Sequence, residues 1–134
     1  MKDLIAKLEA APEGSRELDV EIAVAVGHVD PTCTYDKERD CVEWLEPHEM
    51  GLSEPMGALL HDYTFSIDAA LTLVPEGWNV WLLGVAQQIS NGVFSHEPKP
   101  FAEVMNAKEV VLGAHASTPA LALCIAALKA LDKP

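Results

Sequence analysis

Residues 117–131 read STPALALCIAALKAL, and this stretch decides the fold. Thr118 is a good helix N-cap, and Pro119 suits the first helical position because it has no N–H to leave unpaired. Lys129 lies in the last turn, where a cation interacts favourably with the helix dipole. The residues between are almost all apolar, so they cannot share one side of a helix. We predict a helix that is buried on most of its surface, between a sheet and a neighbouring helix.

Two further helices are predicted near the N-terminus. Residues 3–11 carry apolar side chains at helical spacing before a Pro and a Gly. Residues 16–26 follow Ser15, an N-cap residue, and end before Gly27, which suits the left-handed position after a helix. Asp19 lies near the start of this second helix, where an acidic side chain interacts favourably with the dipole.

The second half of the chain contains a third helix and several strands. Thr64 or Ser66 can cap a helix that runs to Val74, since Pro and Gly follow it. Aromatic and β-branched residues then indicate strands. The connection after Met105 is short enough for a hairpin. The strands are predicted at residues 78–86, 101–105 and 109–114.

This order of elements predicts one domain, residues 1–134, of the α+β class. We expect a three- to four-stranded antiparallel meander packed with three to four helices as an α/β sandwich. Trp78 and Trp81 are expected to pack the sheet against the helices. Residues 28–62 show no regular pattern, so we expect a long irregular acidic insert there, with a short strand near Trp44 and a helical turn near Met56.

The formal net charge of −12 excludes some classes of partner. Direct nucleic-acid binding needs clustered Lys and Arg, and an anionic membrane surface would repel this chain. No apolar run is long enough to span a membrane, and no secretory signal is visible. We therefore expect a protein of a reducing cytoplasmic setting whose three cysteines, Cys33, Cys41 and Cys124, are free thiols.

Four residues of the acidic insert have the right chemistry for zinc: His28, Cys33, Cys41 and His48. Their spacing fits no zinc finger or knuckle, which bring ligands as close pairs. We interpret them as part of a solvated polar loop, and a small metal-dependent hydrolase is the alternative. No phosphate-binding or nucleophile motif is present, so we predict no catalytic residue and no cofactor.

The acidic run offers a candidate surface for a protein partner. It consists of Asp36, Glu38, Asp40, Glu43, Trp44 and Glu46. An acidic loop is usually only solvated, but this one could bind a basic protein, or could act as an anti-defence inhibitor or an acidic mimic of nucleic-acid phosphates. A continuous acidic face, extended by Glu49, would favour mimicry. Carboxylates scattered around the surface would argue against it.

Three blocks of the sequence resemble a known family. They are RELDVEIAVAVG (residues 16–27), YTFSIDAALTLVPEGW (63–78) and TPALALCIAALKAL (118–131). Their order is similar to that of the phage ABA-sandwich domain, found in small phage and prophage proteins. The resemblance implies helices flanking an antiparallel sheet, and it brings no activity or site residue. The leading hypothesis is a non-enzymatic accessory protein that binds another protein. Unpaired sheet edges also favour a homodimer.

Overall fold

The computed structural model describes residues 1–47, 51–86, 89–90, 93–94 and 99–132, with backbone alone at 85, 86, 89, 90, 93 and 94. Four helices and two three-stranded antiparallel sheets make up most of this part, so the predicted α+β class is confirmed. The elements are α1 (Lys2–Ala10), α2 (Arg16–Ala25), β1 (Thr34–Asp36), β2 (Cys41–Pro47), β3 (Ser53–Leu59), α3 (Ile67–Leu71), β4 (Trp78–Ala86), β5 (Ile89–Ser90), β6 (Val93–Phe94), β7 (Lys99–Asn106), β8 (Val111–His115) and α4 (Pro119–Leu131).

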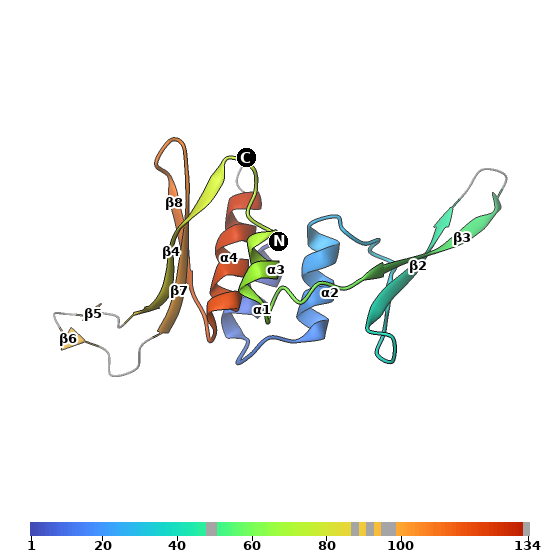
Figure 1. Cartoon of the computed structure of the whole chain (residues 1–134), viewed down its shortest axis with the longest axis horizontal. Helices are drawn as coiled ribbons and strands as arrows, with labels where there is room; N and C mark the ends of the chain where they lie inside the picture. Colours follow the sequence, from blue (N-terminus) through green and yellow to red (C-terminus); the bar gives the residue numbers. More distant parts are fainter. Residues whose placement is uncertain (48–50, 87–88, 91–92, 95–98, 133–134) are drawn as a thin grey trace.

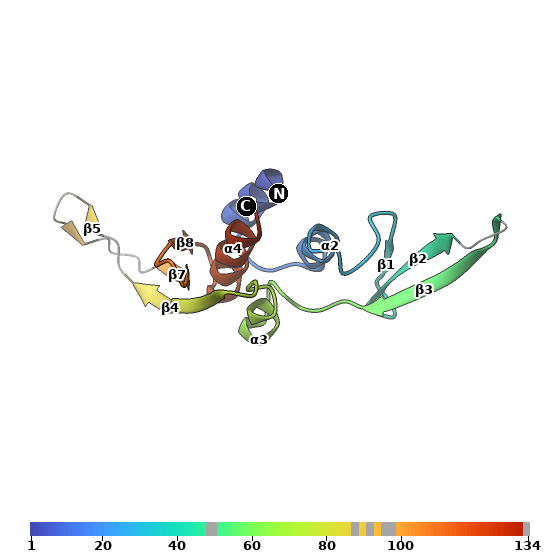
Figure 2. The same ribbon diagram turned by 90° about the horizontal axis from the view of Figure 1, so that it is seen from above.

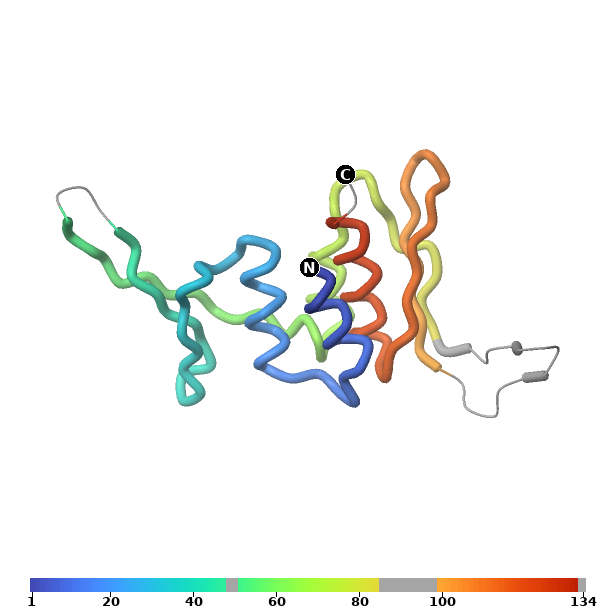
Figure 3. The backbone as a smooth tube through the Cα atoms, turned by 180° about the vertical axis from the view of Figure 1, so that it is seen from behind, coloured from blue at the N-terminus to red at the C-terminus, as the bar shows by residue number. Residues whose placement is uncertain are grey.

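The molecule is elongated, with helices in the middle and one sheet at each end (Figure 1). Seen from above, the sheet β4-β7-β8 lies beside α4, and the sheet β1-β2-β3 extends away from α2 in the opposite direction (Figure 2). From behind, the backbone leaves the helices once for each sheet, and the N-terminus lies among the helices (Figure 3).

Helix α4 is the centre of the core, as predicted. The Thr118 hydroxyl accepts from the Leu121 N–H, Pro119 begins the helix, and every residue from Ala120 to Leu128 is buried. The helix contacts β7 and β8 on one side and α1 and α3 on others. It therefore packs against both a sheet and helices, because an all-apolar helix must be covered on every side.

The meander of β4, β7 and β8 is confirmed. Strands β4 and β7 pair from Trp78–Asn106 to Ala86–Lys99, with a register shift between Val80 and Leu82. Strands β7 and β8 form the predicted hairpin, whose turn is closed by Asn106, a residue that accepts from the Lys108 and Val110 N–H groups. Trp78 packs against the core as expected, but the prediction for Trp81 is wrong: at the register shift, its side chain is 55% exposed.

The expectation of an irregular insert at residues 28–62 is wrong. This segment forms β1, β2 and β3, in which β2 pairs with β3 from Cys41–Leu59 to Pro47–Ser53. The strand near Trp44 is confirmed, whereas the residues around Met56 belong to β3 and not to a helical turn. Charged side chains, Pro55 and Gly57 interrupt the apolar alternation that reveals a strand in sequence, because little of this sheet is buried.

The third helix is shorter than predicted. Ser66 is its N-cap, accepting from the Ala69 N–H, and α3 ends at Leu71 instead of Val74. Thr64 does not cap it. Thr64 is 1% exposed, and its backbone N–H and hydroxyl both bond to Asp19.

Candidate functional site

The projecting sheet, residues 34–59, contains all six residues predicted to bind a partner, and we call it the arm. Its core-facing side carries Tyr35, Val42 and Ala58, since side chains in strands alternate between faces. Among the described residues of the arm, Val42 alone is fully buried, and nearly all of β3 is exposed. The arm is thus held to the helices at its base and is open to solvent along most of its length (Figure 2).

Arg16 of α2 anchors the base of the arm. Its guanidinium donates to the Leu60 carbonyl at 2.8 Å and to the Asp40 carboxylate at 3.0 Å. It also lies 6.0 Å from the centre of the Tyr35 ring, and the Tyr35 hydroxyl donates to Asp40. The hydrogen bond from Tyr35, together with Arg16, lowers the pKa of Asp40. Asp40 therefore has a structural role at the base of the arm, and Arg16 compensates much of its negative charge.

Arg16 is in turn held by Asp19, a residue that the sequence placed only as a helix-dipole partner. Asp19 is 0% exposed, lies 2.8 Å from the Arg16 guanidinium and accepts both hydrogen bonds from Thr64. Burial raises the pKa of Asp19 despite these favourable contacts. An Arg and an Asp three residues apart are common on exposed helices, so no signal in the sequence distinguishes this buried pair.

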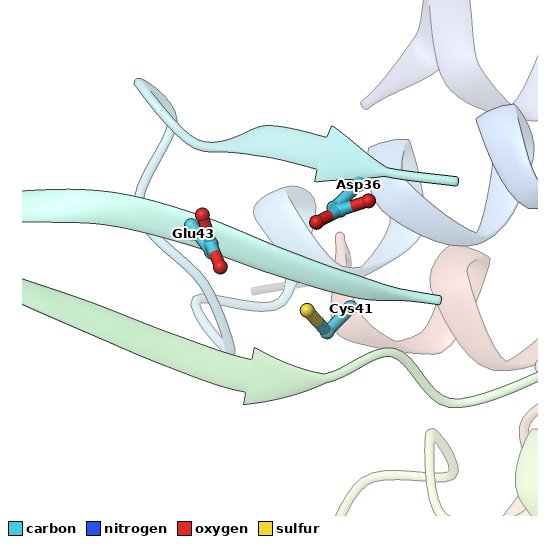
Figure 4. A group of neighbouring side chains, drawn as sticks. All are labelled: Asp36, Cys41 and Glu43. Atoms are coloured by element: carbon cyan, nitrogen blue, oxygen red, sulfur yellow. The ribbon is translucent and has the colours of Figure 1, made fainter. Parts of the chain in front are cut away.

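A cluster of possible metal ligands lies on the outer face of the arm. Asp36 of β1 and Cys41 and Glu43 of β2 place one ligand atom each within 4.8 Å of one another (Figure 4). However, Arg39 lies 3.9 Å from the Asp36 carboxylate and 3.8 Å from that of Glu43, and Asp36 accepts from the Glu38 and Arg39 N–H groups. The cluster is thus an acidic turn in which Arg39 supplies a positive charge beside Asp36 and Glu43.

The four predicted zinc ligands do not meet at one centre within the described part of the chain. His28 lies beside His61, with ring centres 5.1 Å apart, whereas Cys41 lies beside Asp36 and Glu43. Cys33 is half-buried and joins neither group, and His48 lies outside the described residues. Cys33, Cys41 and Cys124 are free, as predicted.

The predicted acidic residues do not form one face. Glu43 and Glu46 lie on opposite sides of β2 because they are three positions apart along the strand. Glu46 accepts from the Trp44 indole N–H at 3.1 Å. Asp40 is paired with Arg16, and Glu49 lies outside the described residues.

The arm also exposes apolar side chains, which the sequence did not single out. Leu45 is 63% exposed, Met56 39% and Leu59 78%. Leu45 and Met56 border a groove of about 430 Å³ between β2 and β3 that is also lined by Glu43 and Trp44, whereas Leu59 is not part of its lining. Gly57 forms part of the groove, where a side chain would narrow it. The sequence gives no clear signal for this surface, because β2 and β3 contain one leucine each, Leu45 and Leu59, and only the pairing of the strands places both on one face.

The chain has no significant match to any family model, curated protein or solved structure. The resemblance of its three blocks to the phage ABA-sandwich domain therefore stays a prediction. In the described part of the chain, none of the helices has the length and apolar character needed to cross a membrane.

Proposed function

We propose that this chain is a non-enzymatic accessory protein, of phage or prophage type, that binds another protein through the arm. The observation that carries the proposal is the exposure of Leu45, Met56 and Leu59 on a sheet that projects from the helices. Leu45 and Leu59 lie on the outer face of this sheet, and Met56 pairs with Trp44 on the other face. Exposed apolar side chains with charged side chains beside them are typical of protein interaction sites. The proposal places this action in the cytoplasm of a bacterial host.

The chemistry of the arm favours a partner with an apolar contact and a basic rim. Trp44 and Met56 form a cross-strand pair beside the groove, and aromatic residues are frequent anchors of interfaces. Glu38, Glu43 and Glu46 are exposed around them, in a chain of net charge −12. Such charge accelerates encounter with a basic partner and disfavours an acidic one.

The two alternatives have less support. A mimic of nucleic acid needs carboxylates on one face, whereas Glu43 and Glu46 face opposite ways and arginines compensate Asp36 and Asp40. A hydrolase based on the predicted zinc ligands needs His28 and Cys41 at one centre, whereas they have different neighbours.

Affinity capture from bacterial host lysate, with quantitative mass spectrometry, tests the proposal. We expect Leu45→Glu and Leu59→Glu each to reduce recovery of the partner at least about tenfold, since a charge buried at an apolar contact is costly. Both side chains are exposed, so the fold should survive. Leu82→Glu is the matched control, because Leu82 is 45% exposed on a strand of the other sheet.

Two results would contradict the proposal. The first is that no protein is enriched by the wild-type chain over an unrelated acidic protein of similar size. The second is an enriched protein whose recovery falls equally in the control variant, since binding would then not depend on the arm. Native mass spectrometry of the purified chain shows separately whether the arm instead joins two copies.

A further inference from the structure

A second pocket lies on the body of the molecule, away from the arm groove. It has a volume of about 410 Å³ and is formed where α2, α3 and α4 end. Val26 follows α2, Leu73 follows α3, and Leu131 is the last residue of α4. The polar side chains that line it include His28, His61 and Tyr63.

His28 is presented from a fixed backbone. Gly27 adopts the left-handed conformation with φ +76°, the His28 N–H bonds to the Ala23 carbonyl at 2.8 Å, and the Gly27 N–H bonds to the Val24 carbonyl at 3.1 Å. These two bonds form the Schellman motif that closes the end of a helix. The ring of His28 therefore leaves the main chain from a defined point at the C-terminus of α2.

His61 and Tyr63 are positioned from the other side. Arg16 donates to the His61 carbonyl at 3.4 Å, and the Cys124 thiol of α4 donates to the Tyr63 carbonyl at 3.1 Å. Burial raises the pKa of Cys124 to about 12, so the thiol keeps the proton that it donates. The His61 ring lies 5.1 Å from that of His28 and 5.6 Å from that of Tyr63, measured between ring centres.

The Tyr63 side chain is largely buried, but its hydroxyl is not fully enclosed and has no protein partner in the described part of the chain. The residue is 2% exposed, and its hydroxyl makes no hydrogen bond to any residue that the structure describes. Every fully buried polar side-chain atom in that part has a partner, so this hydroxyl keeps access to the pocket. A hydroxyl that lines a pocket and has no protein partner is available to donate to water or to a ligand.

The charges around the pocket favour a cation. No Lys or Arg is among the described residues that line it. The C-termini of α2 and α4, helices of 10 and 13 residues, meet at the pocket and carry partial negative charge. Two neutral imidazoles are good ligands for zinc and related ions. When two imidazoles bind one tetrahedral ion at about 2.0–2.1 Å, their centres lie roughly 5 Å apart.

We propose that His28 and His61 together bind one divalent transition-metal ion, with zinc as the probe, in this pocket. Two protein ligands leave the remaining positions to water or to a small ligand that enters the pocket. The Tyr63 hydroxyl donates a hydrogen bond to that water or ligand. The site is independent of the arm.

Calorimetric titration of zinc into the metal-free full chain tests this proposal. We expect binding of one ion by the wild type and a loss of affinity of at least tenfold in His28→Ala and in His61→Ala. Tyr63→Phe should weaken binding about tenfold, as the loss of an outer hydrogen bond to a metal site does. The two histidines are exposed, so their variants should fold, and circular dichroism checks this.

Two control variants locate the ion. His115→Ala removes an exposed histidine on β8, and Cys41→Ser disrupts the cluster of Asp36, Cys41 and Glu43 on the arm. Both should bind zinc like the wild type. Absence of zinc binding, unchanged affinity in both His28→Ala and His61→Ala, or loss of binding in Cys41→Ser would each overturn the proposal. In the first two cases the 5.1 Å contact is only a packed pair of rings.

Discussion

The buried carboxylate of Asp19 holds together parts of the chain that are far apart in sequence. It accepts hydrogen bonds from the N–H and hydroxyl of Thr64, at 2.8 and 2.7 Å, and pairs with Arg16. Arg16 in turn donates to the Leu60 carbonyl, just after the arm, and to Asp40 within it. Gly14 belongs to the same contact, since a Cβ there would lie 2.4 Å from the Thr64 carbonyl oxygen. A residue predicted to interact only with a helix dipole is thus a structural junction.

Replacement of Asp19 should have a large effect that depends on the substitute. Asp19→Ala leaves Thr64 and Arg16 without their partner, and we expect a loss of about 3–5 kcal/mol in the free energy of unfolding. Asp19→Asn keeps an acceptor for Thr64 and should cost less. Urea denaturation measures both. Glu17→Gln, at an exposed position of the same helix, is the control and should change stability by no more than about 0.5 kcal/mol.

The direction in which pH changes the stability of the wild type relative to Asp19→Asn follows from the pKa of Asp19. Burial raises the pKa of Asp19 in the folded state, so the folded chain binds this proton more tightly than the unfolded chain. The resulting stabilisation is fully present below the unfolded pKa of about 4 and is lost as pH rises through the folded pKa. The wild type should therefore lose stability relative to Asp19→Asn over this range. The opposite slope would contradict the burial effect.

Helix α4 differs from the other helices in being covered on all sides. It packs against β7 and β8 and also against α1 and α3, and its apolar residues leave it no solvent-facing stripe. The shorter α1 and α2 each have a buried and an exposed side. Such helices form mainly through packing, so the stability of the body depends on the fit of side chains around α4.

Shortening a side chain of α4 should therefore be costly. Leu123 is 0% exposed, and Leu123→Ala should lower the free energy of unfolding by about 2–5 kcal/mol, through lost burial and the cavity left behind. Leu131 of the same helix is 41% exposed, and Leu131→Ala should cost far less. Equal losses in the two variants, measured by chemical denaturation, would show that α4 is not the centre of the core.

The two three-stranded sheets of the molecule differ in how much of each is packed against the helices. Strand β7 lies between β4 and β8 and packs against α4, whereas β2 lies between β1 and β3 with only Val42 fully buried. Backbone hydrogen bonds form both ladders, but tertiary packing protects only one of them. The arm is suited to contact a partner, because the body covers only its base and leaves most of its length exposed.

Hydrogen exchange should reveal this difference. Amides of β7 should exchange only when the whole body unfolds, whereas those of the outer half of the β2–β3 ladder, beyond Trp44, should exchange through local opening at least about a hundredfold faster. Mass spectrometry of peptides from the two sheets measures both rates. Equal protection would mean that the arm is covered in solution, for example by a second copy.

The sequence alone was sufficient to predict α4, α2 with its caps, and the meander of β4, β7 and β8. These elements are specified by neighbours within a few residues: Thr118 before Pro119, Ser15 before Arg16, and the short turn after Asn106. Apolar periodicity within an element reports which side is buried, so their core faces could also be inferred. The acidic residues of the arm were identified as candidates on composition alone.

Tertiary structure decided the second sheet and the contacts between residues that are far apart in sequence. The second sheet exists because β2 and β3 pair across an exposed surface, where no buried side requires an apolar pattern. His28 contacts His61, 33 positions later in the chain, and Asp19 contacts Thr64, 45 positions later. Contacts of this range depend on how helices and strands pack together. Local propensities do not encode them, since the same residues would suit a solvated loop equally well.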